Sequence, residues 1–139
     1  MLQTEIRREN TMKKLPLALA LIFVSSSAMA KWIKVDDDYL LDIYVDYATI
    51  RKADNKVSMW DLVDLKSERE VVGTRLLSAK TQNEYDCKKE QWRLVASLFF
   101  NKHMGRGRVV YSGKPSKNWL PIEHNSFTEV LWTIVCGKA

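Results

Sequence analysis

The residue types that catalyse reactions or bind metals are few and scattered in this sequence. The two histidines, His103 and His124, each lie in an expected loop, and neither has a ligand-type residue at metal-binding spacing. The three aspartates at positions 36–38 lack the spacing and the glycine of an EF-hand calcium loop, so we interpret them as a solvated turn. The sequence also contains no phosphate-cradling glycine-rich loop and no nucleophile elbow. We therefore predict no catalytic residue, no metal site, no cofactor and no enzyme activity.

The two cysteines, Cys87 and Cys136, carry the clearest chemistry. An even pair of cysteines in a small exported domain usually forms a disulfide. The competing interpretation, a reactive thiol beside one of the histidines, has no local sequence signature. A disulfide that closes a loop of about 50 residues is expected to stabilise the fold by roughly 4 kcal/mol.

A basic and aromatic set follows the middle of the chain and could bind an acidic partner. Its members are Lys102, Arg106, Arg108, Lys114, Lys117 and Trp119. The alternative is an ordinary solvated turn beside a core tryptophan, and the residues alone leave both interpretations open.

The N-terminal residues have the pattern of a bacterial signal peptide. Met-Lys-Lys at 12–14 gives a basic start, and the apolar run at 15–24 is too short to span a membrane. Small residues at 28 and 30 predict cleavage between Ala30 and Lys31. Residues 1–11 are polar, which favours Met12 as the true start. A buried N-terminal helix of a cytosolic protein would leave the cleavage pattern unexplained.

Cleavage would divide the chain into a leader at 1–30 and a single domain at 31–139, which has no transmembrane segment. The leader holds four of the 22 basic and two of the 17 acidic residues, so the net charge falls from +5 to +3. Part of the basic excess is thereby lost, and export argues against a nucleic-acid partner.

The elements that must position these residues are mostly strands. Alternating apolar and polar residues predict about six antiparallel strands in meander order, at 32–35, 40–45, 57–65, 74–87, 91–101 and 108–112. The charged residues 66–70 are expected to connect two of them, and residues 113–121 to form a surface loop. These features place the domain in the α+β class.

One C-terminal helix is expected to cover the sheet. Ser126 and Glu129 have capping-box spacing, and Gly137 ends the helix. An apolar stripe faces the core through Phe127, Val130, Leu131, Ile134 and Val135. Cys136 falls on the far side from Phe127, so either the last turn unwinds or the helix is contacted from a second direction.

Several short segments, taken in order, resemble the surface-adhesin protein E family over essentially the whole domain. They are Trp32, residues 45–51 (VDYATIR), 85–87 (YDC), Met104-Gly105 with Gly107, 110–112 (VYS), Trp119 with Pro121, and a terminal helix ending at Cys136. The resemblance implies a sheet of about six antiparallel strands with a C-terminal helix tethered by a disulfide, matched here by Cys87 and Cys136. It also implies an exported binding domain. The namesake type of the family is a surface lipoprotein that attaches bacteria to host matrix and serum proteins such as laminin, vitronectin and plasminogen.

The chain departs from the lipoprotein type of this family at the predicted cleavage site. A lipoprotein needs a cysteine directly after the cut, whereas this chain has Lys31. We therefore expect a periplasmic protein without a lipid anchor, secreted or surface-exposed forms remaining open. The alternative function is a soluble periplasmic inhibitor or envelope-stress component, in which case the partner is a periplasmic protein.

Overall fold

The structure is a computed structural model that describes residues 29–137. The predicted signal segment up to residue 28, including the proposed start at Met12, lies outside the described residues. Ala30 and Lys31 are exposed and precede the first strand in irregular backbone. The described helices include none that is long and apolar enough to cross a membrane.

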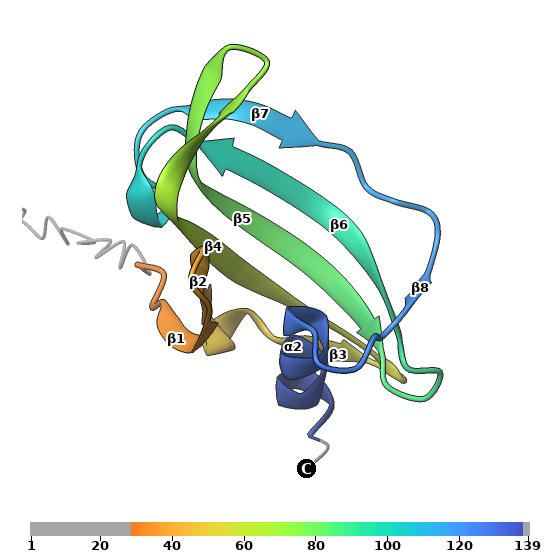
Figure 1. The fold of residues 1–139 in the computed structure, drawn as a ribbon. Helices are drawn as coiled ribbons and strands as arrows, with labels where there is room; N and C mark the ends of the chain where they lie inside the picture. The colour runs from red at the N-terminus through yellow and green to blue at the C-terminus, as the bar shows by residue number, and fades with distance from the viewer. Residues whose placement is uncertain (1–28, 138–139) are drawn as a thin grey trace, which may run out of the picture.

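A single antiparallel sheet dominates the fold, as predicted (Figure 1). Its strands are β1 (Ile33–Asp37), β2 (Leu41–Val45), β3 (Arg51–Ala53), β4 (Lys56–Val71), β5 (Thr74–Asp86), β6 (Gln91–Phe100), β7 (Val109–Gly113) and β8 (Leu120–Pro121). Six of them follow the order β1-β2-β4-β5-β6-β7, which confirms the meander. Two short additional strands, β3 and β8, pair with β4 and β6.

The hairpin of β4 and β5 is longer than the sequence suggested. Residues 66–70, expected to form a connection, continue β4 to Val71, and the register resumes with Arg69 opposite Leu76 after an irregularity. The turn is only Val72 and Gly73. This part of β4 is exposed, so backbone pairing and cross-strand charges maintain the strand without an apolar alternation.

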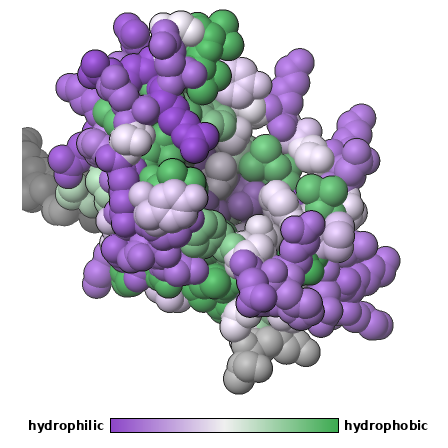
Figure 2. Space-filling view, viewed as in Figure 1, coloured by the Kyte–Doolittle hydropathy of each residue, from purple (hydrophilic) through white to green (hydrophobic). Residues whose placement is uncertain are grey.

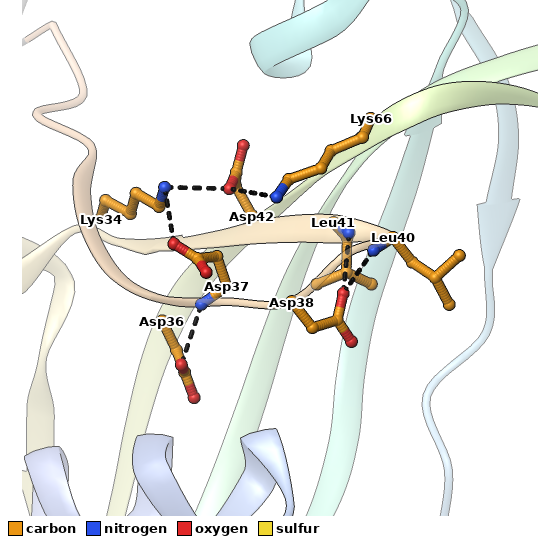
Figure 3. Close-up of polar contacts among 8 residues, drawn as sticks. All are labelled: Lys34, Asp36, Asp37, Asp38, Leu40, Leu41, Asp42 and Lys66. Atoms are coloured by element: carbon orange, nitrogen blue, oxygen red, sulfur yellow. Dashed lines mark hydrogen bonds and ion pairs between the residues drawn. The ribbon is translucent and has the colours of Figure 1, made fainter.

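The acidic run at 36–38 is part strand and part turn, rather than a turn throughout. β1 continues to Asp37, whose carboxylate lies 2.8 Å from Lys34 Nζ. Lys34 Nζ also lies 3.0 Å from Asp42 (Figure 3), and these two carboxylates raise the pKa of the lysine. Asp38 Oδ1 accepts hydrogen bonds from the backbone N–H groups of Leu40 and Leu41. This arrangement is a local Asx-type turn, which needs no bound cation.

Helix α2 (Phe127–Cys136) packs against one end of the sheet (Figure 1). Ser126 caps it as predicted, because its Oγ accepts a hydrogen bond from the N–H of Glu129 at 3.1 Å. The core beneath the helix is formed by strand residues and by the buried helix residues, namely Ile43, Val45, Val57, Met59, Tyr85, Leu131, Trp132 and Val135.

The buried face of α2 is rotated around the helix axis relative to the predicted apolar stripe. Trp132 is buried together with Leu131 and Val135, whereas Phe127 is only partly buried. Cys136 lies four residues after Trp132 and therefore shares its face. The helix reaches Cys136 without unwinding, and the predicted disulfide with Cys87 is present.

Candidate functional site

The second half of the sheet carries an uninterrupted excess of positive charge. Between residues 91 and 122 the chain contains no aspartate or glutamate. This segment forms β6, β7 and β8 and their connections. Its cationic residues are Arg93, Lys102, Arg106, Arg108, Lys114 and Lys117.

The connection between β6 and β7 is fixed to the sheet by hydrogen bonds. It contains the short 3₁₀ helix η3 (His103–Gly105), just as η2 (Tyr47–Thr49) lies between β2 and β3. Ser78 Oγ donates to the Lys102 carbonyl at 2.6 Å and accepts from Gly105 N–H at 2.8 Å. Asp64 Oδ1 accepts from Met104 N–H at 2.8 Å. The backbone that carries the nearby cations is therefore held in place.

The end of this connection is also ordered. Asn101 Oδ1 accepts a hydrogen bond from Arg108 N–H at 2.8 Å, and the Asn101 N–H donates to the Arg108 carbonyl at 3.2 Å. Gly107 between them has φ of +82°, a conformation that favours glycine. The side chains of Lys102, Arg106 and Arg108 are exposed.

Two adjoining depressions lie beside the tip of the β4–β5 hairpin. One is a cationic cleft of about 460 Å³, lined by Gly73, Thr74, Arg75, Leu77, Asn101, Lys102 and Arg108. The other is an apolar groove of about 410 Å³, lined by Val71, Val72, Thr74, Leu76, Phe99, Val110 and Tyr111. Thr74 belongs to both, so the cleft and the groove share a wall. Figure 2 shows apolar surface at the hairpin tip next to hydrophilic side chains.

Lys114, Lys117 and Trp119 occupy a different region, the connection between β7 and β8. The Trp119 ring lies 4.5 Å from the Arg93 guanidinium carbon and 5.9 Å from Lys56 Nζ. These cation–π contacts hold the connection against the sheet. Lys114 and Lys117 are exposed and line neither the cleft nor the groove. The predicted basic and aromatic set is thus divided between two places.

Sequence reasoning missed several residues that the fold adds to this surface. Arg75 joins the cationic cleft from β5, and Phe99 and Tyr111 form the groove. Their rings meet edge to face, with centroids 5.4 Å apart. The dipeptide Val72-Gly73 was the available signal, because a glycine at the second position of a two-residue loop is typical of a hairpin turn.

One buried carboxylate lies on the sheet away from this surface. Asp61 is 2% exposed and accepts hydrogen bonds from Thr81 Oγ1 and Asn83 Nδ2. Burial raises its pKa to about 6. The hydroxyl of nearby Tyr85 has no hydrogen-bond partner among the described residues. Both donors lie on β5, so the Asp61 carboxylate links β4 to β5 inside the sheet.

The two histidines are each paired with a single carboxylate. His103 Nδ1 lies 3.2 Å from Asp64, and His124 Nδ1 lies 2.7 Å from Glu129. Within residues 29–137, no group of three or more histidine, cysteine, aspartate or glutamate side chains is placed to hold a metal ion.

Comparison with solved structures identifies the fold. The chain is similar to crystal form II of Haemophilus influenzae protein E, with a TM-score of 0.59 and 16% identity over 76% of this chain and 96% of that chain. It is also similar to protein E from non-typeable Haemophilus influenzae, with a TM-score of 0.52 and 16% identity over 77% and 84% of the two chains. Likeness at this level of identity supports the fold alone.

Sequence comparison extends this result to the family. No curated protein matches the chain significantly in a sequence search. The model of the family described as surface-adhesin protein E matches residues 32–137, which include all the strands that the structure describes and α2. The chain therefore belongs to the surface-adhesin protein E family.

Proposed function

We propose that this protein is a non-catalytic exported domain of the adhesin type that binds an acidic surface on another protein. The observation that carries this proposal is the segment at 91–122, which places six cationic residues and no carboxylate along one half of the sheet. Family membership supports an adhesin-like role for an exported or surface protein. Host matrix or serum proteins such as laminin and vitronectin are the candidate partners.

Electrostatic attraction of this kind gives a defined salt dependence. Exposed charges interact over about 8–10 Å at physiological ionic strength, and added salt shortens that range. The exposed cations near β7 should therefore accelerate association with an acidic partner more than they slow dissociation. Binding should weaken strongly as salt concentration rises.

The test is biolayer interferometry of the purified protein on immobilised laminin and vitronectin, at about 50 and 300 mM NaCl. We expect binding at low salt that falls about tenfold or more at high salt. The double variant R106E/R108E should weaken low-salt binding by a similar factor.

A matched control separates a defined surface from net charge alone. Lys88 and Lys89 are exposed in the turn between β5 and β6, at the other end of the β5–β6 pair from Arg106 and Arg108. The variant K88E/K89E changes the net charge equally and should alter binding less than about twofold. Equal losses of binding in both variants would show that overall charge, not a defined surface, causes the binding. Absence of binding to both host proteins would contradict an adhesin-type function.

The site of action is tested separately. We propose that the chain is cleaved before Lys31 and released into the periplasm without a lipid anchor. Fractionation of the native host, followed by protease treatment of whole cells, locates the mature chain. Loss on protease treatment would show that the chain reaches the cell surface, while protection in the osmotic-shock fraction would direct the search to periplasmic partners.

A further inference from the structure

The tip of the β4–β5 hairpin presents an apolar residue in a strained conformation. Val72 and Gly73 form a two-residue turn with φ values of 51° and 74°, as a type I′ turn requires. Asparagine is the preferred first residue of such a turn, whereas a β-branched residue at positive φ is a rare outlier. Val72 is nevertheless 96% exposed, so burial within the chain does not offset this strain.

Val72 is continuous with other exposed apolar groups. Val71 is 49% exposed and Tyr111 is 60% exposed, and both line the apolar groove with Val72. Single exposed apolar residues are ordinary, but a contiguous patch surrounded by polar groups is typical of an interaction site. Strain retained at such a place is also characteristic of functional segments.

The charges around the groove favour an acidic occupant. On the hairpin, Arg75 Nε lies 2.7 Å from the Glu68 carboxylate, and Arg75 also stands opposite Glu70 in the strand register. The hairpin thus has nearly balanced charge. Across the cleft, Lys102 and Arg108 form no ion pair with any residue in the described part of the chain. Their positive charge is available to a partner.

The backbone next to the groove favours an extended occupant. β7 is the last strand of the sheet order, so one of its edges is unpaired within residues 29–137. Such an edge offers backbone donors and acceptors to an added strand. Val110 and Tyr111 of the same strand line the groove, which places apolar contact and backbone hydrogen bonding side by side.

We propose that the hairpin tip and β7 together bind an extended segment of a protein partner. An aromatic or branched side chain of that segment packs into the groove beside Val72 and Tyr111. A neighbouring carboxylate of the same segment meets Lys102 and Arg108 in the cleft. This inference rests on the proposed function and names the chemistry of the partner. A simple polyanion fits it less well, because it would occupy the cleft and leave the apolar groove in water.

The probe is a phage-displayed library of 12-residue peptides, selected on the immobilised wild-type protein. We expect enrichment of sequences in which an aromatic or branched residue stands next to aspartate or glutamate. Synthetic copies of the enriched peptides are then titrated against the variants by fluorescence anisotropy. V72N should weaken binding about tenfold through loss of apolar contact. R108A should weaken it by a similar factor and reduce its salt dependence.

With V72N, a loss of binding cannot be attributed to misfolding. Asparagine suits the positive φ at this position, so the variant should be at least as stable as the wild type. The control K88A/K89A removes two exposed charges from the turn between β5 and β6, outside the segment at 91–122, and should change peptide binding less than twofold.

The possible results distinguish failure of this inference from failure of the proposed function. Peptides that respond to R108A and V72N but not to K88A/K89A support the inference. Peptides that are acidic throughout, compete with sodium polyphosphate and ignore V72N overturn it, while leaving the proposed function intact. Failure to enrich any peptide, or an equal dependence on Lys88 and Lys89, also overturns it. If the protein dimerises through this face and V72N abolishes the dimer, the occupant is a second copy of the chain. That result would also overturn the proposed partner segment.

Discussion

The two ends of the sheet use apolar residues in opposite ways. At the helix end, Val57 is 3% exposed and Tyr85 is fully buried beneath α2, and the disulfide fixes the helix there. At the hairpin end, Val72 is 96% exposed and Tyr111 is 60% exposed. One end thus provides the stability of the domain, and the other keeps its apolar surface accessible.

The lengths of the elements explain this division. β4 has 16 residues, which span roughly 50 Å at about 3.3 Å per residue. α2 has 10 residues and spans roughly 15 Å. One short helix can cover only part of such a sheet, so the hairpin extends beyond the core. Its exposed part is held by strand pairing and a tight turn.

Loss of the disulfide should produce the largest effect, and it should act on the helix end. Removing the link between Cys87 and Cys136, by C87S/C136S, frees a loop closed over 49 residues of sequence separation. The chain-entropy model gives a loss of about 4 kcal/mol in unfolding free energy. Urea denaturation followed by circular dichroism measures it, and reduction of the wild type should match the variant. A loss below about 1 kcal/mol would show that α2 packs independently of its tether.

Asp61 should make the stability of the domain depend on pH. Its folded pKa of about 6 lies above the ordinary value, because burial disfavours the charged form. The folded state therefore binds more protons than the unfolded state between about pH 4 and 6, and stability falls as pH rises through that window. Above pH 6, keeping the buried Asp61 carboxylate charged lowers the unfolding free energy by an amount on the order of 2–3 kcal/mol.

The variant D61N isolates this contribution. It should be more stable than the wild type at pH 7.5 by about 2 kcal/mol, and the difference should shrink towards pH 4. Denaturation curves of both proteins across that range provide the measurement. Parallel pH profiles would show that Asp61 titrates near its ordinary pKa and is more solvated than its burial indicates.

The same substitution at the two ends tests the comparison directly. Val57→Ala removes buried methyl groups and should cost about 2 kcal/mol. Val72→Ala removes methyl groups already in water and should change stability by less than about 0.5 kcal/mol. Thermal or urea denaturation of the wild type and both variants measures the two changes in stability. A comparable loss at Val72 would mean that the hairpin tip is buried in solution, for example by another copy.

Local signals made much of the fold predictable from the sequence. The alternation in β5 and β6, the capping pair Ser126 and Glu129, and the cysteine pair each depend on nearby residues or simple chemistry. The extension of β4 through 66–70 was not predictable, because a strand in solvent on both faces has no apolar alternation. The sequence pattern misplaces the buried face of α2, because the predicted apolar stripe omits Trp132.

The candidate site was less predictable than the fold, because long-range pairing assembles it. Lys102 and Arg108 are separated by only a short connection, so sequence proximity brought them together correctly. Arg75 reaches the same cleft only because β5 and β6 are paired. Trp119 was expected near those cations, but it stacks on Arg93 of β6 instead. Proximity along the chain therefore identified part of the surface and missed its opposite wall.

A modest gain in stability distinguishes the two ends most sharply. Val72→Asn replaces a β-branched residue at φ of 51° with the residue that a type I′ turn prefers. Relief of that strain should raise the unfolding free energy by about 1 kcal/mol, measured by urea denaturation. No apolar burial is lost in exchange, since the valine is 96% exposed. If the variant is instead less stable, Val72 contributes to folding and its exposure is not a feature kept for binding. If stability rises while peptide binding falls, the hairpin end maintains its binding surface at the expense of stability, whereas the helix end gains stability from the same kind of residue.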